Sequence, residues 1–116
     1  MKQLTTYNAL LGFELEKQRK EKGLEQSQIA DLAGISQPVL SRLEKGKALI
    51  TIDQLFVICK ALEVNPEHII RKVNSGVKAI EKENKVDITT TKSASDFGPI
   101  LTGAAIGSLL TLFLKK

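Results

Sequence analysis

Apolar residues recur at the spacing of an amphipathic helix in five short segments of the first 73 residues. In the first segment Leu11 and Leu15 share one face, and charged side chains surround them until Gly23 ends the run. Nowhere in this region do apolar and polar residues alternate as they would in a half-buried strand. The pattern therefore predicts an all-α domain whose helices cover about residues 8–22, 26–33, 36–44, 52–62 and 66–73.

Residues that start and stop helices mark the same boundaries. Ser36 precedes Pro38, and a hydroxyl cap followed by proline in the first turn is a strong start signal. Asn65 and Pro66 repeat this pattern before the fifth segment. Gly34 separates the second segment from the third, and it predicts a left-handed turn there because glycine adopts that conformation at little steric cost.

The composition excludes several kinds of site. The chain has one Cys and one His, so it forms neither an internal disulfide nor a zinc site of the usual Cys/His type. Cys59 falls on the apolar stripe of the fourth segment, and His68 has no partner at catalytic spacing. The absence of Trp argues against stacking platforms for single-stranded nucleic acid. We therefore expect no enzyme activity, metal or cofactor, while the net charge of +4 permits an anionic partner.

Two of the predicted helices form a distinctive pair, joined by a short turn at Gly34. Their segment reads LEQSQIADLAGISQPVLSRLEKG over residues 24–46. It closely resembles the Cro/repressor (XRE-type) helix-turn-helix family, and the resemblance extends over about residues 11–70. The resemblance implies a five-helix, lambda-repressor-like domain that binds double-stranded DNA as a homodimer. Two recognition helices would then lie one DNA turn apart, about 34 Å, on a near-palindromic operator.

Residues 36–44 correspond to the recognition helix of that family, and four of them are candidate base contacts. Gln37 stands at the start of the helix, where a glutamine can pair with both N6 and N7 of adenine. Arg42 reaches guanine or a phosphate, and Ser41 is a shorter donor on an adjoining face. Pro38 replaces the polar base reader of many relatives and offers only apolar contact, to a thymine methyl group.

The resemblance also implies contacts to the DNA backbone and one structural pair. The phosphate contacts are assigned to Gln26, Ser36, Lys45 and Lys47. Gln26 is implied to brace Gln37 as well. Arg19 and Glu44 match a pair that bridges the first helix to the end of the recognition helix. Glu25 departs from the family pattern, because Thr, Ser or Asn usually precedes the second helix and a glutamate caps poorly beside DNA phosphate.

After the predicted domain, residues 1–73, the composition changes twice. Residues 74–96 read as a polar linker in which Val77 and Ile80 fit a short helix, followed by a flexible stretch at residues 89–95. Residues 97–116 predict a C-terminal hydrophobic helix, since residues 97–114 carry no charge. As a helix these eighteen residues span about 27 Å, against about 30 Å for the hydrocarbon core of a membrane.

The C-terminal segment has two possible surroundings. A helix that is apolar on nearly every side needs burial all round, either in membrane lipid or against a partner helix. Gly103, Gly107 and Thr111 form a stripe of small residues along which two helices can approach closely. Lys115 and Lys116 follow the segment and oppose the positive-inside tendency of a membrane anchor, so both interpretations stay open.

Together these features predict a sequence-specific transcriptional regulator, by default a repressor. The first residues lack the apolar core of a signal peptide, so we expect a cytoplasmic DNA-binding domain, tethered to the inner membrane or oligomerised by its tail. Two alternatives share the fold. One is an assembly or anchoring module that uses the helix-turn-helix for protein contacts, which Glu25 favours and Gln37 and Arg42 oppose. The other is an antitoxin-type autorepressor, whose toxin-binding surface the sequence does not locate.

Overall fold

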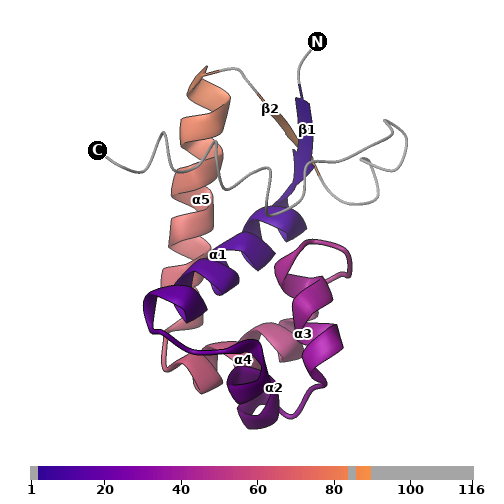
Figure 1. Cartoon of the computed structure of the whole chain (residues 1–116). Coiled ribbons are helices and arrows are strands. Elements are labelled where there is room, and N and C mark those ends of the chain that lie inside the picture. The colour runs from indigo at the N-terminus through magenta and orange to yellow at the C-terminus, as the bar shows by residue number, and fades with distance from the viewer. Residues whose placement is uncertain (1–2, 84–85, 90–116) are drawn as a thin grey trace.

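Five helices and two short strands make up the part of the chain that the computed structural model describes, residues 3–83 and 86–89 (Figure 1). The prediction of a five-helix domain is confirmed. The elements in chain order are β1 (Gln3–Thr6), α1 (Tyr7–Glu21), α2 (Gln26–Ala33), α3 (Gln37–Glu44), α4 (Ile52–Leu62), α5 (Pro66–Glu83) and β2 (Val86–Thr89).

Short polar residues close the beginnings of the helices, as the sequence predicted. The hydroxyl of Ser36 accepts a hydrogen bond from the backbone N–H of Val39 at 3.2 Å and caps α3. Thr51 and Gln54 form a reciprocal capping box at α4, with hydrogen bonds of 3.0 and 2.9 Å. Each cap satisfies backbone N–H groups that have no partner inside the helix, so the ends of the helices follow from local chemistry.

The core lies where α1, α2, α3 and α4 meet the start of α5. Leu15, Ile29 and Leu40 are completely buried, and they come from three different helices. Further buried members of this cluster are Ala30, Leu43, Leu55, Ile58, Cys59, Leu62 and Ile69. The helix stripes predicted from the sequence therefore converge on one apolar interior.

Helix α5 is longer than predicted. The apolar pattern predicted an end at Val73, and this boundary is wrong because the helix continues to Glu83. Its apolar stripe runs on through Val77 and Ile80, which are 5% and 0% exposed. The polar triplet that follows Val73 resembles a stop signal, but burial of the stripe against α1 outweighs that local preference. Residues 74–83, expected in the linker, thus extend the fifth helix.

The strands were not predicted. β1 and β2 pair in parallel, with Gln3 opposite Val86 and Thr6 opposite Thr89. Four residues are too few to show a clear alternation of apolar and polar positions, and the partners are about eighty residues apart in the chain. The strand pair is an addition at the two ends of the predicted all-α domain, and Thr89, expected in a flexible stretch, forms the end of β2. Figure 1 shows the pair beside the upper half of α5.

The C-terminal hydrophobic helix predicted over residues 97–116 lies outside the part of the chain that the structure describes. Residues 97–114, with the stripe of Gly103, Gly107 and Thr111, lie outside the described residues. Within residues 3–83 and 86–89, no helix has both the length and the apolar character needed to cross a membrane.

Candidate nucleic-acid interface

Helices α2 and α3 form the helix-turn-helix, and the turn between them is built around Gly34. This residue has a left-handed backbone with φ of 73°, as its glycine predicts. The N–H of Ile35 donates to the carbonyl of Ala30 at 3.0 Å and closes the end of α2. Ala30 is 1% exposed, so a small residue occupies the position where the two helices pack. The turn sets α3 at a fixed angle to α2.

Helix α3 has one buried and one exposed face. Leu40 and Leu43 are at most 1% exposed and hold the helix on the core. On the other side Gln37, Pro38 and Arg42 are exposed. The fourth predicted base contact, Ser41, is partly buried. The structure thus brings the four candidates onto one short helix, three of them open to solvent.

A chain of hydrogen bonds connects the start of α3 to its own end. The Nε2 amide of Gln37 donates to Oε1 of Gln26 at 2.6 Å. The Nε2 amide of Gln26 in turn donates to Oε1 of Glu44 at 2.8 Å. Gln26 is the first residue of α2, so this chain ties the two helices of the motif together. Gln26 therefore holds the exposed Gln37 side chain in one orientation, and Glu44 in turn holds Gln26.

Arg19 anchors the far end of that chain. Its Nε and Nη2 atoms donate to the two carboxylate oxygens of Glu44 at 2.8 and 3.0 Å. Its Nη1 donates to the carbonyl of Leu24 at 2.7 Å. The side chains of Arg19 and Glu44 are only 8% and 1% exposed. The hydrogen bond to Glu44 raises the pKa of the Arg19 guanidinium, so the pair stays charged.

The four predicted phosphate contacts fall into two groups. Gln26 and Ser36 lie at the starts of α2 and α3, where Ser36 also caps its helix. Lys45 and Lys47 are exposed in the loop after α3. In that loop the N–H of Lys47 donates to the carbonyl of Arg42 at 2.9 Å. The groups therefore mark opposite ends of the recognition helix.

Asn8 is a positioning residue that the sequence analysis missed. Its Nδ2 donates to the carbonyl of Ala48 and its Oδ1 accepts from the N–H of Ile50, both at 2.9 Å. The two bonds fasten the loop after α3 to α1, and this loop carries Lys45 and Lys47. No local signal identifies Asn8, because its partners are forty or more residues away in the chain.

Two glycines bring α1 close to the end of α3, and the sequence predicted this role for neither of them. A Cβ atom at Gly12 would overlap the carbonyl oxygen of Leu43. At Gly46, whose φ is 73°, a Cβ would lie 3.0 Å from that of Ala9. Both positions admit only hydrogen where the backbones approach.

Glu25, which departs from the family pattern, is the residue before α2, and Gln28 satisfies its backbone N–H. The side-chain oxygen of Gln28 accepts a hydrogen bond from the backbone N–H of Glu25 at 2.8 Å. Glu25 is exposed, so it adds a negative charge next to the start of α2. Helix α2 therefore forms without a short hydroxyl or amide cap.

The residues that the structure describes meet the requirements of neither a metal site nor a reactive thiol. There, no three His, Cys, Asp or Glu side chains gather in a way that holds a metal ion. Cys59 is buried in the core, and burial raises the pKa of its thiol to about 11. The thiol is therefore protonated at neutral pH.

Comparison with known proteins agrees with this geometry. The sequence pattern of a family described as helix-turn-helix matches residues 15–69. Comparison with curated protein sequences found no match.

Solved structures of three regulators are similar to the described domain. The clp gene regulator ClgR from Corynebacterium glutamicum is 25% identical with a TM-score of 0.57, covering 59% of this chain and 88% of its own. The restriction-modification controller protein C.Esp1396I is 27% identical with a TM-score of 0.55, covering 58% and 86%. The controller protein C.AhdI from Aeromonas hydrophila shares the fold at 24% identity and a TM-score of 0.51, covering 53% and 92%.

The matched residues include both helices of the motif, the buried Arg19–Glu44 pair and the whole core cluster. The resemblance of residues 15–69 to the Cro/repressor (XRE-type) helix-turn-helix family of DNA-binding regulators is therefore confirmed.

Proposed function

We propose that this chain is a sequence-specific transcriptional regulator that binds a near-palindromic operator as a dimer and represses by covering a promoter. The observation that carries the proposal is the support of Gln37, which stands exposed at the start of α3 and is held by Gln26. A side chain held in place before binding loses less conformational freedom when it pairs with a base. This support favours a role for Gln37 in binding a ligand, in addition to tying α2 to α3.

The amide of Gln37 has the groups needed to read adenine. One of its two N–H groups donates to Gln26, which leaves a second N–H and the carbonyl oxygen for a base. Adenine presents N7 as acceptor and N6 as donor in the major groove, so both groups of Gln37 find partners. Arg42 would pair with guanine or a phosphate, Ser41 would add a donor, and Pro38 would touch a thymine methyl.

Phosphate contacts at both ends of α3 would orient the recognition helix in the groove. Gln26 and Ser36 lie at its start, and Lys45 and Lys47 lie beyond its end. Contacts of this kind set register and affinity without reading sequence. Asn8 contributes indirectly, because it fastens the loop that carries the two lysines.

Operator selection from a random duplex library, followed by titration of the selected duplex, tests the base contacts. Gln37→Ala should weaken binding by about 1–3 kcal/mol and lose discrimination at one A·T pair. Lys47→Ala should weaken binding to all sequences alike and lower the salt slope by about one. Lys60→Ala, an exposed lysine on α4, is the control and should change neither quantity.

The same titration separates DNA recognition from an assembly role. If the double variant Gln37→Ala/Arg42→Ala binds the selected duplex as wild type does, the recognition assignment is wrong. A domain that uses this surface for protein contacts would give that result.

Dimerisation is the second part of the proposal. The family resemblance supports it, and α5 with the residues after it is the expected interface. Two recognition helices would then meet half-sites one DNA turn apart, about 34 Å. Light scattering of the protein with and without duplex measures the stoichiometry. A half-site duplex bound as tightly as the full palindrome would contradict the dimer.

We propose third that residues 97–114 attach this DNA-binding domain to a membrane, or to a partner helix, from the cytoplasmic side. Their uncharged composition supports attachment, and the Gly103, Gly107 and Thr111 stripe supports close helix contact. Alkaline carbonate extraction of cell membranes tests the first surrounding. Gly103→Leu with Gly107→Leu tests the second, and Ala104→Leu is its control. Full-length protein that is wholly soluble and unaffected by the glycine changes would contradict both.

A further inference from the structure

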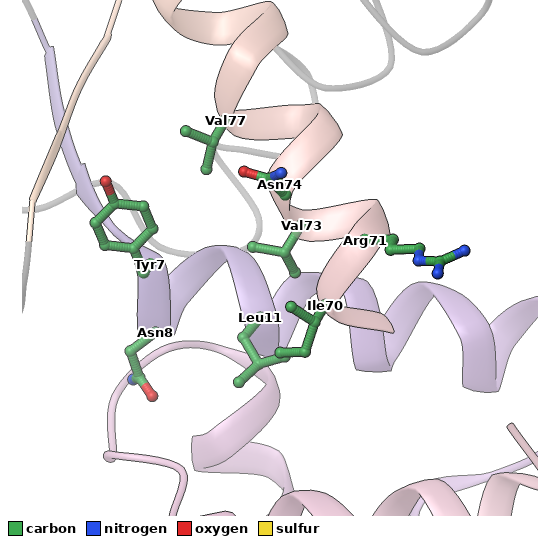
Figure 2. Close-up of a pocket in the computed structure, with 8 residues that line it drawn as sticks. All are labelled: Tyr7, Asn8, Leu11, Ile70, Arg71, Val73, Asn74 and Val77. Atoms are coloured by element: carbon green, nitrogen blue, oxygen red, sulfur yellow. The ribbon is translucent and has the colours of Figure 1, made fainter. Parts of the chain in front are cut away.

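An apolar groove lies between α1 and α5, apart from the helix-turn-helix. Five apolar side chains line it, Tyr7 and Leu11 from α1 and Ile70, Val73 and Val77 from α5, together with three polar ones. Its volume is about 370 Å³, within the range of sites that hold small ligands. Figure 2 shows Leu11, Ile70 and Val73 between the two helices, with Tyr7 and Val77 above them, while Arg71 points away from the others. None of the lining residues belongs to α2 or α3, so the proposed DNA contacts leave the groove open.

The groove exposes apolar surface that a soluble domain ordinarily covers. Tyr7 is 46% exposed and Ile70 is 49% exposed. Adjoining large apolar side chains that stay in contact with water commonly mark a binding surface.

The path of the chain brings its own apolar segment to this groove. Strand β2 ends at Thr89, and Thr89 lies opposite Thr6 in the parallel pair. Tyr7 follows Thr6 directly and lines the groove. The chain therefore leaves the described fold one strand spacing, about 5 Å, from the groove's edge. Seven further residues lead to Phe97, and extended they reach about 23 Å.

Tethering favours this segment over a second copy of the protein. A segment joined to its site by a short stretch of chain is present there at an effective concentration of about millimolar. A second copy outside the proposed dimer would have to compete from its bulk concentration. Docking of the segment requires that a dimer formed through α5 uses a face of that helix outside the groove lining. The segment also matches the groove in chemistry, since residues 97–114 carry no charge.

We propose that the groove between α1 and α5 is a docking site for the uncharged C-terminal segment of the same chain. Along α5 the groove extends from Ile70 to Val77, about 10 Å, so it accepts only the part of the segment nearest the linker. That part carries Phe97, Ile100 and Leu101. Docking covers Tyr7 and Ile70 and shields these three side chains from water.

The docked state competes with the attachment proposed above, because both use the same side chains. Away from lipid, the groove covers the start of the segment; with lipid present, insertion withdraws it. The inference does not depend on DNA binding. It rests on the uncharged segment and on the position of Thr89 beside Thr6.

Cysteine cross-linking of the full-length protein without lipid tests the proposal. Asn74→Cys lies in the groove, and Phe97→Cys lies at the start of the segment. A short bismaleimide should join the two within one chain. Lys72→Cys with Phe97→Cys is the matched control, since residue 72 is exposed on α5 outside the groove lining. Native Cys59 is buried and does not compete.

The groove pair should cross-link at least about ten times faster than the control pair, reflecting the higher effective concentration. Equal rates for the two pairs would overturn the proposal. So would cross-links that join two chains, because they would place a second copy in the groove.

The only tyrosine of the chain provides an independent measurement. The protein has no Trp, so its tyrosine fluorescence reports on Tyr7 alone. Replacing Phe97, Ile100 and Leu101 by Asp should raise acrylamide quenching about twofold, because the ring loses its cover. The matched variant replaces Leu109, Leu110 and Leu112 by Asp and should quench like wild type. Equal quenching in all three proteins would overturn the proposal.

Vesicles of phosphatidylglycerol and phosphatidylcholine separate this inference from membrane attachment. If vesicles abolish the groove cross-link, both docking and attachment to lipid are supported. If the cross-link forms at the same rate with vesicles, docking is supported and attachment to lipid fails.

Discussion

Glu44 joins the end of the recognition helix α3 to α1 and α2. Its carboxylate accepts hydrogen bonds from the Nε and Nη2 atoms of Arg19 and from the amide of Gln26. The carboxylate is buried, so its charge has lost most of its hydration. Such a charge is tolerated only while all its partners remain, because an unpaired ion in the interior is costly.

We therefore predict that Arg19→Leu destabilises the fold strongly. It removes two of three hydrogen bonds and leaves a buried carboxylate, which costs about 3–5 kcal/mol. Urea unfolding followed by circular dichroism measures the free energy of unfolding. Arg71→Ala, which breaks an exposed pair with Glu67, should change it by less than about 0.5 kcal/mol. Equal losses in both variants would contradict this account of the buried pair.

Cys59 makes the stability depend on alkaline pH. Burial raises the pKa of its thiol from 9.0 to about 11. Above pH 9 the thiol ionises in the unfolded chain but keeps its proton in the folded one. The unfolded state then binds fewer protons, so the free energy of unfolding falls as the pH rises from about 9 to about 11.

Cys59→Ala should remove this part of the pH dependence. Urea unfolding at several pH values gives the slope of the free energy of unfolding against pH for each protein. The difference between the two slopes is the contribution of the thiol alone. The thiol's share of the loss should be at most about 3 kcal/mol. Parallel slopes for the two proteins would show that the thiol does not contribute.

At the scale of elements, the close approach of α1 to the end of α3 is the contact that orients the recognition helix. Gly12 permits it, because the carbonyl of Leu43 occupies the space that a side chain would need. Asn8 fastens the following loop to the same helix. Helix α1 thus contacts the end of α3 at Gly12 and Arg19, and it holds the following loop through Asn8.

Gly12→Ala should accordingly disturb both stability and DNA binding. The added methyl group forces two backbones apart, at about 1–3 kcal/mol, although alanine is the better helix former. Gly23→Ala is the comparison, because nothing lies within 4 Å of its Cβ and only its φ of 69° opposes the change. Gly23→Ala should cost about 1 kcal/mol and leave operator affinity unchanged. An operator affinity for Gly12→Ala equal to that of wild type would refute the role of this contact.

The five helices were predictable because the signals that define them are local. Caps such as Ser36 and Thr51, the turn at Gly34 and the spacing of Leu40 and Leu43 all act within a few residues. The end of α5 was not predictable in this way. Its polar residues after Val73 favour a stop, and only the burial of Val77 and Ile80 in the folded chain decides for continuation.

At the scale of the whole molecule, the two strands close the fold. β1 leads into α1 and β2 follows α5, so their pairing joins the two ends of the described domain. Thr5 and Thr6 are at most 3% exposed there. The same pairing determines where the rest of the chain emerges, beside Tyr7 and the groove.

Deletion of residues 1–5 should release β2 without unfolding the helices. β2 loses its only strand partner in the described fold, and an isolated strand does not persist in water. Hydrogen exchange should show loss of amide protection at residues 86–89 and retention in α1 to α4. Deletion of residues 1–2 alone leaves β1 intact and should preserve protection of β2. Continued protection at residues 86–89 after the longer deletion would contradict the pairing.

The amino-acid sequence by itself determined the helices of the motif, the residues of α3 and the family that residues 15–69 resemble. These features depend on interactions between residues a few positions apart, which a pattern along the chain records. Only the tertiary structure decided the hydrogen bond from Gln26 to Glu44, the roles of Asn8 and Gly12, and the parallel strand pair. Those contacts join residues 18 to 83 positions apart, and packing of the whole chain selects them.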